Sequence, residues 1–116
     1  MAGQDPVVEA LHALIKAVEQ NRADGRLAID KAKNLLEART SGRPWPELVS
    51  EEPSPLLVEL LAGKLDRLAT ASSRFRRAQA RALYDDGLTM DEIAALFGVT
   101  RQRVSALLKP RATDPA

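Results

Sequence analysis

Hydrophobic side chains recur every three or four residues along most of the chain, which is the spacing of one face of an α-helix. The first series follows Asp5 and Pro6, a pair typical of a helix start, with the capping residue before a first-turn proline. Its apolar members, up to residue 20, are Val7, Val8, Leu11, Leu14, Ile15 and Val18. This pattern predicts an amphipathic helix that begins near residue 6.

A second helical series begins after Asp24-Gly25, a dipeptide typical of turns. Apolar residues continue at helical spacing from residue 26 to about residue 39, and Ser41-Gly42 is expected to end the helix. We therefore predict a hairpin of two helices over residues 6–40. The alternative is one long helix interrupted at the glycine.

The stretch "GRPWPELVSEEPSP", residues 42–55, contains four prolines and is predicted to be a linker. It carries the only tryptophan of the chain, Trp45. We expect this side chain to pack as a lid over the N-terminal helices. A platform for a ligand is the alternative.

Ser54-Pro55 again resembles a helix start, and no proline follows until residue 110. One long connecting helix is expected from residue 55 to 86, with a bend possible at "TASS", residues 70–73. Its apolar stripe is formed by Leu57, Leu61, Leu65, Leu68, Phe75, Ala78 and Ala82. A single chain of this size could hardly cover such a stripe, so we expect a partner helix to cover part of it.

The pattern changes after residue 86, in "GLTMDEIAALFGVTRQRVSALLK". Gly87 ends the long helix, and Thr89 with Glu92 forms the signature of a capping box. A short helix over residues 90–97 is therefore expected, and Gly98 provides the left-handed conformation of a tight turn. Thr100 is expected to cap a last helix that turns Val104, Leu107 and Leu108 inward.

These spacings are those of a helix-turn-helix. Ala94 is small where the second helix would cross the first, and Ile93 faces inward together with Leu96 or Phe97. Val99, Val104 and Leu107 are expected to fill the angle between the two helices. The pattern favours DNA binding, and the alternative is a helical hairpin used only for packing or for contact with another protein.

The segment "LTMDEIAALFGVTRQRVSALL" resembles region 4, the C-terminal promoter-reading domain of primary bacterial sigma factors. It also resembles small helix-turn-helix regulators, common in actinobacteria, that share this module. The likeness covers about residues 74–109 and is strongest at "DEIAALFGVTRQRV". Residues 1–73 show no sigma-factor pattern, and the chain is too short to hold the other promoter-binding regions, so a full sigma factor is excluded.

The resemblance implies a recognition helix over residues 101–109. It puts four residues on the side that faces the groove: Arg101, Gln102, Ser105 and Ala106. Sigma factors usually carry Glu, Arg and Gln where this chain has Gln102, Ser105 and Ala106. The same scaffold is therefore expected to read a sequence other than the sigma-type promoter hexamer.

Side-chain chemistry gives each position a role. Arg101 is suited to a bidentate contact with guanine and Gln102 to one with adenine, while Ser105 and Ala106 suit a hydroxyl or thymine-methyl contact. Phosphate contacts are expected from helix caps and basic residues: Thr89, Thr100, Arg103, Lys109, Arg74, Arg77 and Arg81. Two alternatives remain, an ion pair of Arg103 with Asp91 or Glu92, and simple solvation of the arginines.

The charge distribution agrees with this assignment. The whole chain has a net charge of only +1, but residues 74–111 carry eight Lys/Arg against four Asp/Glu, whereas residues 1–73 carry nine against eleven. The positive charge is thus concentrated in the segment that holds the helix-turn-helix.

A homodimer is expected because one recognition helix reads too few base pairs for selectivity, and dimers place two such helices about 34 Å apart in successive grooves. The predicted dimerisation residues are Leu11, Leu14, Ile15, Val18, Leu57, Leu61, Leu65 and Leu68. The alternative is that the helices cover one another within a monomer.

Other functional classes lack the necessary residues. The chain has no cysteine and a single histidine, His12, and no catalytic constellation or metal-ligand cluster can be identified. We therefore expect no enzyme, no cofactor and no metal. No apolar run approaches the roughly 18 residues of a membrane span. A cytoplasmic protein at the nucleoid is expected.

Taken together, low aromatic content (3%), abundant Ala and Leu and the absence of strand patterns predict an all-α protein. The expected parts are a dimerisation or regulatory region (1–70), a DNA-binding domain (71–111) and a disordered tail (112–116). The expected function is that of a sequence-specific transcriptional regulator on double-stranded DNA. The alternatives are a nucleoid-associated protein and an adaptor that contacts RNA polymerase.

Overall fold

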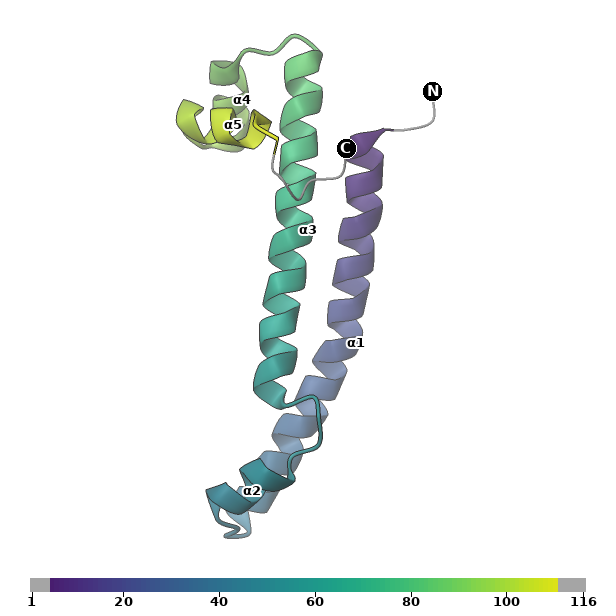
Figure 1. Ribbon diagram of the computed structural model, residues 1–116, viewed down its shortest axis with the longest axis vertical. Helices are drawn as coiled ribbons and strands as arrows, with labels where there is room; N and C mark the ends of the chain where they lie inside the picture. The colour runs from purple at the N-terminus through teal and green to yellow at the C-terminus, as the bar shows by residue number, and fades with distance from the viewer. Residues whose placement is uncertain (1–4, 111–116) are drawn as a thin grey trace. The chain divides into compact units, whose positions relative to one another are not determined.

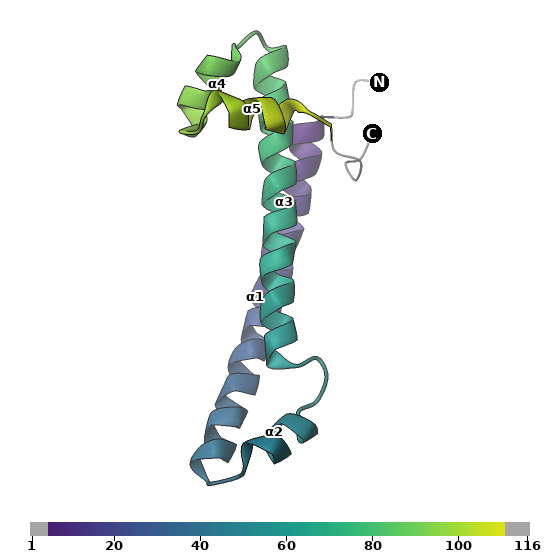
Figure 2. The ribbon, with the colours of Figure 1, turned by 60° about the vertical axis from the view of Figure 1, so that its left-hand side comes forward.

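The computed structural model describes residues 5–110 and is all-α, as predicted. Over that range it has no strand and five helices, α1 (Pro6–Thr40), α2 (Trp45–Glu51), α3 (Leu57–Asp85), α4 (Met90–Phe97) and α5 (Arg101–Leu108) (Figures 1 and 2). None of these helices is long and apolar enough to cross a membrane. The tail predicted at 112–116 lies outside the described residues.

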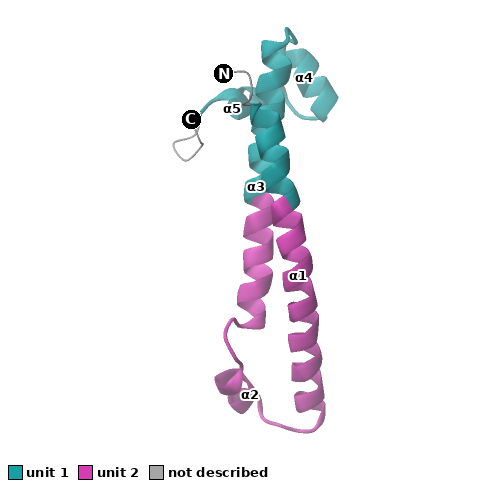
Figure 3. Cartoon of the chain, turned by 90° about the vertical axis from the view of Figure 1, so that its right-hand side faces the viewer, with its two compact units in different colours: residues 1–15, 70–116 teal, residues 16–69 magenta. Residues whose placement is uncertain are grey.

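The chain divides into two compact units (Figure 3). Unit 2 comprises residues 16–69, and unit 1 comprises residues 1–15 and 70–116. The division within α3 lies next to the predicted boundary at residue 70. The prediction placed everything up to residue 70 in one N-terminal region, whereas the described residues 5–15 belong to unit 1.

The predicted hairpin at Asp24-Gly25 is wrong, because α1 is a single helix of 35 residues. It begins as expected, with Asp5 Oδ1 accepting hydrogen bonds from the amides of Val7 (2.9 Å) and Val8 (3.4 Å). A glycine inside a helix costs only about 1 kcal/mol, which tertiary contacts readily offset. Here a Cβ at Gly25 would lie 3.2 Å from Lys64 Nζ, so the glycine leaves room for that lysine.

A polar layer holds α1 against α3 within unit 2. Arg67 Nη1 donates to Asn21 Oδ1 (2.6 Å) and pairs with Asp24 Oδ2 (3.0 Å). Asn21 Nδ2 donates to the Lys64 carbonyl (3.0 Å), and Lys64 Nζ donates to the Asn21 carbonyl. These four side chains sit where α1 and α3 meet, so they fix the register of the two helices.

The predicted linker at 42–55 contains a helix, α2, with Pro44 at its N-cap and Pro46 in its first turn, where proline is tolerated. The lid interpretation of Trp45 is also wrong, since the residue is 49% exposed, with the Arg39 guanidinium of α1 5.9 Å from its ring centre. Leu48 is the residue of α2 that is buried.

The long helix α3 begins two residues later than predicted, at Leu57, and runs without interruption through 70–73. Two acidic side chains, rather than Ser54, bind its first amides. Glu59 Oε1 accepts from the Leu56 amide (2.8 Å) and Glu52 Oε2 accepts from the Leu57 amide (2.6 Å). Carboxylates are favourable at this end because of the positive end of the helix dipole.

Candidate nucleic-acid interface

The first helix of the predicted helix-turn-helix begins where the sequence places it. Gly87, with φ at 104°, ends α3 in a conformation that favours glycine. Thr89 then forms a complete capping box with Glu92, because its hydroxyl accepts from the Glu92 amide (3.1 Å) while Glu92 Oε1 accepts from the Thr89 amide (2.8 Å).

The turn between α4 and α5 is also confirmed. Gly98 adopts the left-handed conformation with φ at 68°, and the next amide, that of Val99, donates to the Ala94 carbonyl (3.0 Å). Thr100 caps α5 by accepting from the Arg103 amide at 3.1 Å. The direction of the predicted recognition helix is thus set by one glycine and one threonine.

A small apolar core joins α4 and α5 to the C-terminal end of α3. Its buried members are Ala80, Ile93, Ala94, Val104, Leu107 and Leu108, and Ile93 and Val104 are the largest side chains that are fully buried. Leu83, Leu88, Met90 and Phe97 pack around them. Figure 2 shows the arrangement of these helices, in which α5 runs across α3.

Two expectations about this core need adjustment. Of the pair Leu96 and Phe97, it is Phe97 that packs inward, beneath the guanidinium of Arg76 at 4.2 Å from the ring centre, whereas Leu96 is exposed. Val99 was expected to fill the angle between the helices, but 39% of it is exposed. Ala80 from α3, which the sequence pattern did not indicate, belongs to the core instead.

The predicted base-reading residues share the face of α5 opposite its buried residues. Arg101, Gln102 and Ala106 are exposed, and Ser105 is half-buried. Burial of Val104, Leu107 and Leu108 leaves Arg103 exposed as well, and the 101, 102, 105 and 106 positions beside it form the outward row, since residues one turn apart share a helix face. The side chains are therefore presented together on one short, fixed helix.

Arg101 has a neighbour that sequence reasoning missed. Its Nη1 lies 3.9 Å from Asp91 Oδ2, with both side chains largely exposed, so the pair contributes little to stability. The sequence suggested Arg103 as the partner of Asp91 or Glu92. Within residues 5–110 Arg103 forms neither ion pair; Arg101 approaches Asp91 instead, and Glu92 belongs to the capping box.

Arg77 and Arg81, predicted to contact phosphate, bind the C-terminal end of α5. Arg77 Nη1 lies within hydrogen-bond distance of the carbonyls of Ala106 (3.3 Å), Leu107 (3.4 Å) and Lys109 (3.1 Å). Arg81 Nη2 donates to the Leu108 carbonyl (2.8 Å). Both guanidiniums thereby bind carbonyls at a helix end, of which that of Ala106 also accepts from the Lys109 amide, and they orient α5.

These arginines also border a hollow of about 300 Å³ in unit 1. Arg74, Arg77, Arg81 and Lys109 line it together with Pro6, Glu9, Ala78, Leu107, Leu108 and Pro110. Four cationic residues against a single carboxylate make this a basic surface beside the end of α5. Phosphate contacts by Arg74, Lys109, Thr89, Thr100 and Arg103 remain predictions.

The predicted dimerisation residues divide into two groups. Leu14 and Leu57 are half-buried. The other six stay exposed on α1 and α3: Leu11, Ile15, Val18, Leu61, Leu65 and Leu68. What α1 buries is mainly alanine, namely Ala10, Ala17 and Ala28, so its larger apolar side chains remain available to another surface.

His, Asp and Glu side chains do not gather in threes as potential metal ligands anywhere in residues 5–110. Comparisons with protein-family models, with curated proteins and with solved structures find no match to this chain.

Proposed function

We propose that this chain is a sequence-specific regulator of transcription that binds double-stranded DNA in the major groove through α5 and acts as a homodimer. The observation that carries the proposal is the combination of a capped helix-turn-helix with an outward row of Arg101, Gln102, Ser105 and Ala106. A helix of this kind, held over a second helix, is the standard arrangement for inserting side chains into the major groove.

The polar row on α5 suits base reading. Arginine and glutamine at its start carry the donors and acceptors that make bidentate contacts with guanine and adenine. The weak ion pair with Asp91 leaves Arg101 free to exchange that partner for a base edge. Lys109 and Arg74 supply positive charge at the other end of the helix, where phosphates would lie.

Arg77 and Arg81 enter the proposal in a different role. Since their guanidiniums bind carbonyls of α5, they act as positioning residues that hold the recognition helix at a fixed angle to α3. Positive charge at the C-terminal end of a helix is also favourable for the helix dipole. Their loss is therefore expected to weaken binding to all DNA sequences alike.

The homodimer is supported by the arrangement of apolar rows in unit 2. On α1 the packed row is spaced alternately by four and three residues, through Ala17, Asn21, Asp24, Ala28, Lys31, Leu35 and Ala38. On α3 the packed row is Leu57, Leu60, Lys64 and Arg67. Such spacing is that of helices that pack along their length.

A second, exposed row follows each packed row by one residue. It comprises Val18, Ile29 and Leu36 on α1 and Val58, Leu61, Leu65 and Leu68 on α3. The helices are antiparallel, since residue 21 of α1 contacts residues 64 and 67 while residue 31 contacts residue 53. In an antiparallel pair, an offset of the same sense puts both exposed rows on one side, which forms an apolar flank.

This apolar flank fits a second copy of the chain. Two helical pairs that join by such flanks bury them in a four-helix bundle, the common way to cover a wide apolar face. The bundle would give the protein the two recognition helices that selectivity requires. A cytoplasmic protein acting at the nucleoid, with no catalytic step, cofactor or metal, is part of the same proposal.

Selection of bound sequences from a random duplex library tests the proposal. The full chain is expected to enrich a motif with two related half-sites. Arg101→Ala and Gln102→Ala should each relax the preference at particular base pairs, whereas Lys109→Ala should lower affinity without changing the motif. Arg26→Ala, which removes an exposed arginine of α1, is the matched control.

The outcomes separate the competing functions. Strong binding with no enriched motif would identify a nucleoid-associated protein, and equal effects of the three α5 variants would contradict the assigned roles. Absence of duplex binding would leave an adaptor that contacts RNA polymerase or another regulator.

A further inference from the structure

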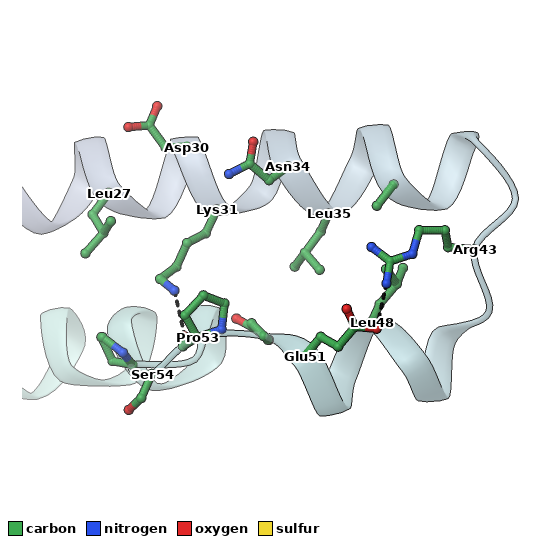
Figure 4. Close-up of a pocket in the computed structure, with 13 residues that line it drawn as sticks. Leu27, Asp30, Lys31, Asn34, Leu35, Arg43, Leu48, Glu51, Pro53 and Ser54 are labelled. Atoms are coloured by element: carbon green, nitrogen blue, oxygen red, sulfur yellow. Dashed lines mark hydrogen bonds and ion pairs between the residues drawn. The ribbon is translucent and has the colours of Figure 1, made fainter.

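A cavity of about 510 Å³ lies in unit 2, and none of the residues assigned to DNA lines it (Figure 4). One wall is a single face of α1, formed by Leu27, Lys31, Leu35 and Ala38 at spacings of four and three residues. The opposite wall is α2 with the segment that follows it, which contributes Leu48, Glu51, Glu52, Pro53, Ser54 and Pro55. The volume of the cavity is in the range of sites that hold small organic molecules.

The interior of this cavity is apolar around one ammonium group. Leu27 and Leu35 point into it on either side of Lys31, and Leu48 faces them from α2 (Figure 4). Lys31 reaches across the cavity and donates one hydrogen bond, to the Pro53 carbonyl at 2.8 Å. An ammonium group has three donors, so two remain for another acceptor.

The two cations that line the cavity, Lys31 and Arg43, differ in their partners. Within residues 5–110 this lysine forms no ion pair with a carboxylate, whereas the other lining cation, Arg43, binds Glu47 (2.5 Å) and Glu51 (2.6 Å). Arg43 is thus shared by two carboxylates, and Lys31 is the lining cation that no carboxylate of the described residues pairs with.

Three carboxylates line the cavity against two cations, and each of them is bound to another group or turned away from Lys31. Glu51 pairs with Arg43, and Glu52 accepts from the Leu57 amide at the start of α3. Asp30 points away from the cavity, on the far side of α1 (Figure 4). The Lys31 ammonium, flanked by Leu27 and Leu35, therefore keeps hydrogen-bond donors for an entering carboxylate, beside the engaged carboxylates of Glu51 and Glu52.

We propose that this cavity binds a small amphipathic monocarboxylate, whose carboxylate pairs with Lys31 while its apolar part lies against Leu27, Leu35 and Leu48. Charge-assisted hydrogen bonds from an ammonium to a carboxylate are among the stronger ones, and burial of the apolar part adds to them. Such a molecule would bridge α1 to α2 and to the segment that leads into α3. The proposal stands on unit 2 alone and does not depend on DNA binding.

Calorimetric titration of the full chain with sodium octanoate and with sodium benzoate tests this site. Saturable binding of at least one carboxylate is expected below about 10 mM, with a rise in melting temperature because ligand binds the folded state. Lys31→Met keeps the length of the side chain and should weaken that binding at least about tenfold. Lys33→Met, on an exposed position of α1 outside the cavity, should change it less than about twofold.

Two further measurements locate the ligand and its chemistry. Octylamine, which has a similar tail and the opposite charge, should bind at least about tenfold more weakly than octanoate. Amide shifts caused by octanoate should centre on residues 27–38 and 48–57. Leu35→Phe, which partly fills the cavity, should also weaken binding and provides a second variant if Lys31→Met unfolds.

The proposal is overturned if neither carboxylate binds, if Lys31→Met binds as well as the original protein, or if octylamine binds equally. Shifts centred elsewhere in the chain would overturn it too.

Discussion

The guanidinium of Arg81 on α3 donates a 2.8 Å hydrogen bond to the carbonyl oxygen of Leu108, the last residue of α5. The same side chain lies 3.7 Å from Asp85 and near the ring of Tyr84. A helix end without backbone partners is therefore completed by a side chain from another helix. Because Leu108 is also part of the core, this bond links the orientation of α5 to the packing beneath it.

Arg81→Ala is expected to lower the free energy of unfolding by about 1–2 kcal/mol, since it removes a charged hydrogen bond to a carbonyl. DNA affinity should fall for all sequences alike. Arg74→Ala, which removes a cation that lines the hollow and whose side chain makes no hydrogen bond within residues 5–110, should leave stability nearly unchanged and reduce the salt dependence of DNA binding. Urea unfolding and duplex titration measure the two effects, and equal loss of stability in both variants would contradict the positioning role.

The capping box of α4 gives a second prediction. Thr89→Ala removes the oxygen that accepts from the Glu92 amide, and such losses typically cost about 1 kcal/mol. Ser72→Ala, at an exposed position inside α3, is the control and should stay within about 0.5 kcal/mol of the original protein. Thermal unfolding followed by circular dichroism measures both. If the two variants are equally stable, the box does not hold the start of α4.

The elements predicted well from the sequence are those that local chemistry determines. Thr89, Gly98 and Thr100 act within four residues of their own positions, so their roles are visible in the chain itself. The inward residues of α5 follow from helical spacing alone. The outward row of the candidate site, from Arg101 to Ala106, is the complement of that spacing.

The elements predicted wrongly depend on partners far along the chain. Asp24-Gly25 was expected to be a turn, but Arg67 and Lys64, about 40 positions away, hold this part of α1 in a helix. The prolines of residues 42–55 led to the prediction of a linker in place of α2, although the spacing of Arg43, Glu47 and Glu51 is helical. No local signal tells that Arg77 and Arg81 face α5 rather than solvent.

The apolar flank on unit 2 gives a third prediction. Leu65 is 72% exposed, so Leu65→Glu should leave helix content unchanged. It should convert the dimer to a monomer, because dimerisation would bury the new carboxylate in an apolar interface. Thr70→Glu adds the same charge outside the exposed row and should stay dimeric. Sedimentation equilibrium of both variants decides the point. A monomeric original protein, or a dimeric Leu65→Glu variant, would contradict the bundle.

The ion pairs of Arg43 give a prediction about pH. Hydrogen bonds from the Arg43 guanidinium hold the pKa of the Glu47 carboxyl below its ordinary value, and Glu47 and Glu51 raise the pKa of Arg43. A carboxylate with a lowered pKa stabilises the folded state above the ordinary value of about 4.3, and this contribution is lost as the pH falls through the folded-state pKa.

Glu47→Gln should therefore be less stable than the original protein at pH 7, with the difference shrinking as the pH falls below about 4.3. Urea unfolding at pH 7, 5, 4 and 3 measures it. Glu19→Gln removes an exposed carboxylate without a recorded hydrogen bond and serves as the control at each pH. A difference that grows toward acid pH would contradict the role assigned to Arg43.

DNA binding through α5 is tested most directly by fluorescence anisotropy of the full chain with a random-sequence duplex across a salt series. A variant lacking three cations of α5 and its end (Arg101→Ala, Arg103→Ala, Lys109→Ala) is compared with one lacking three exposed cations of α1 (Arg22→Ala, Arg26→Ala, Lys33→Ala).

The original protein and the α1 variant are expected to bind, and to weaken steeply as salt rises, because phosphate contacts release counterions. The α5 variant should lose most of that affinity and have a shallower salt dependence. No binding of the original protein to any duplex at low salt, or equal binding by the α5 variant, would contradict the proposed function.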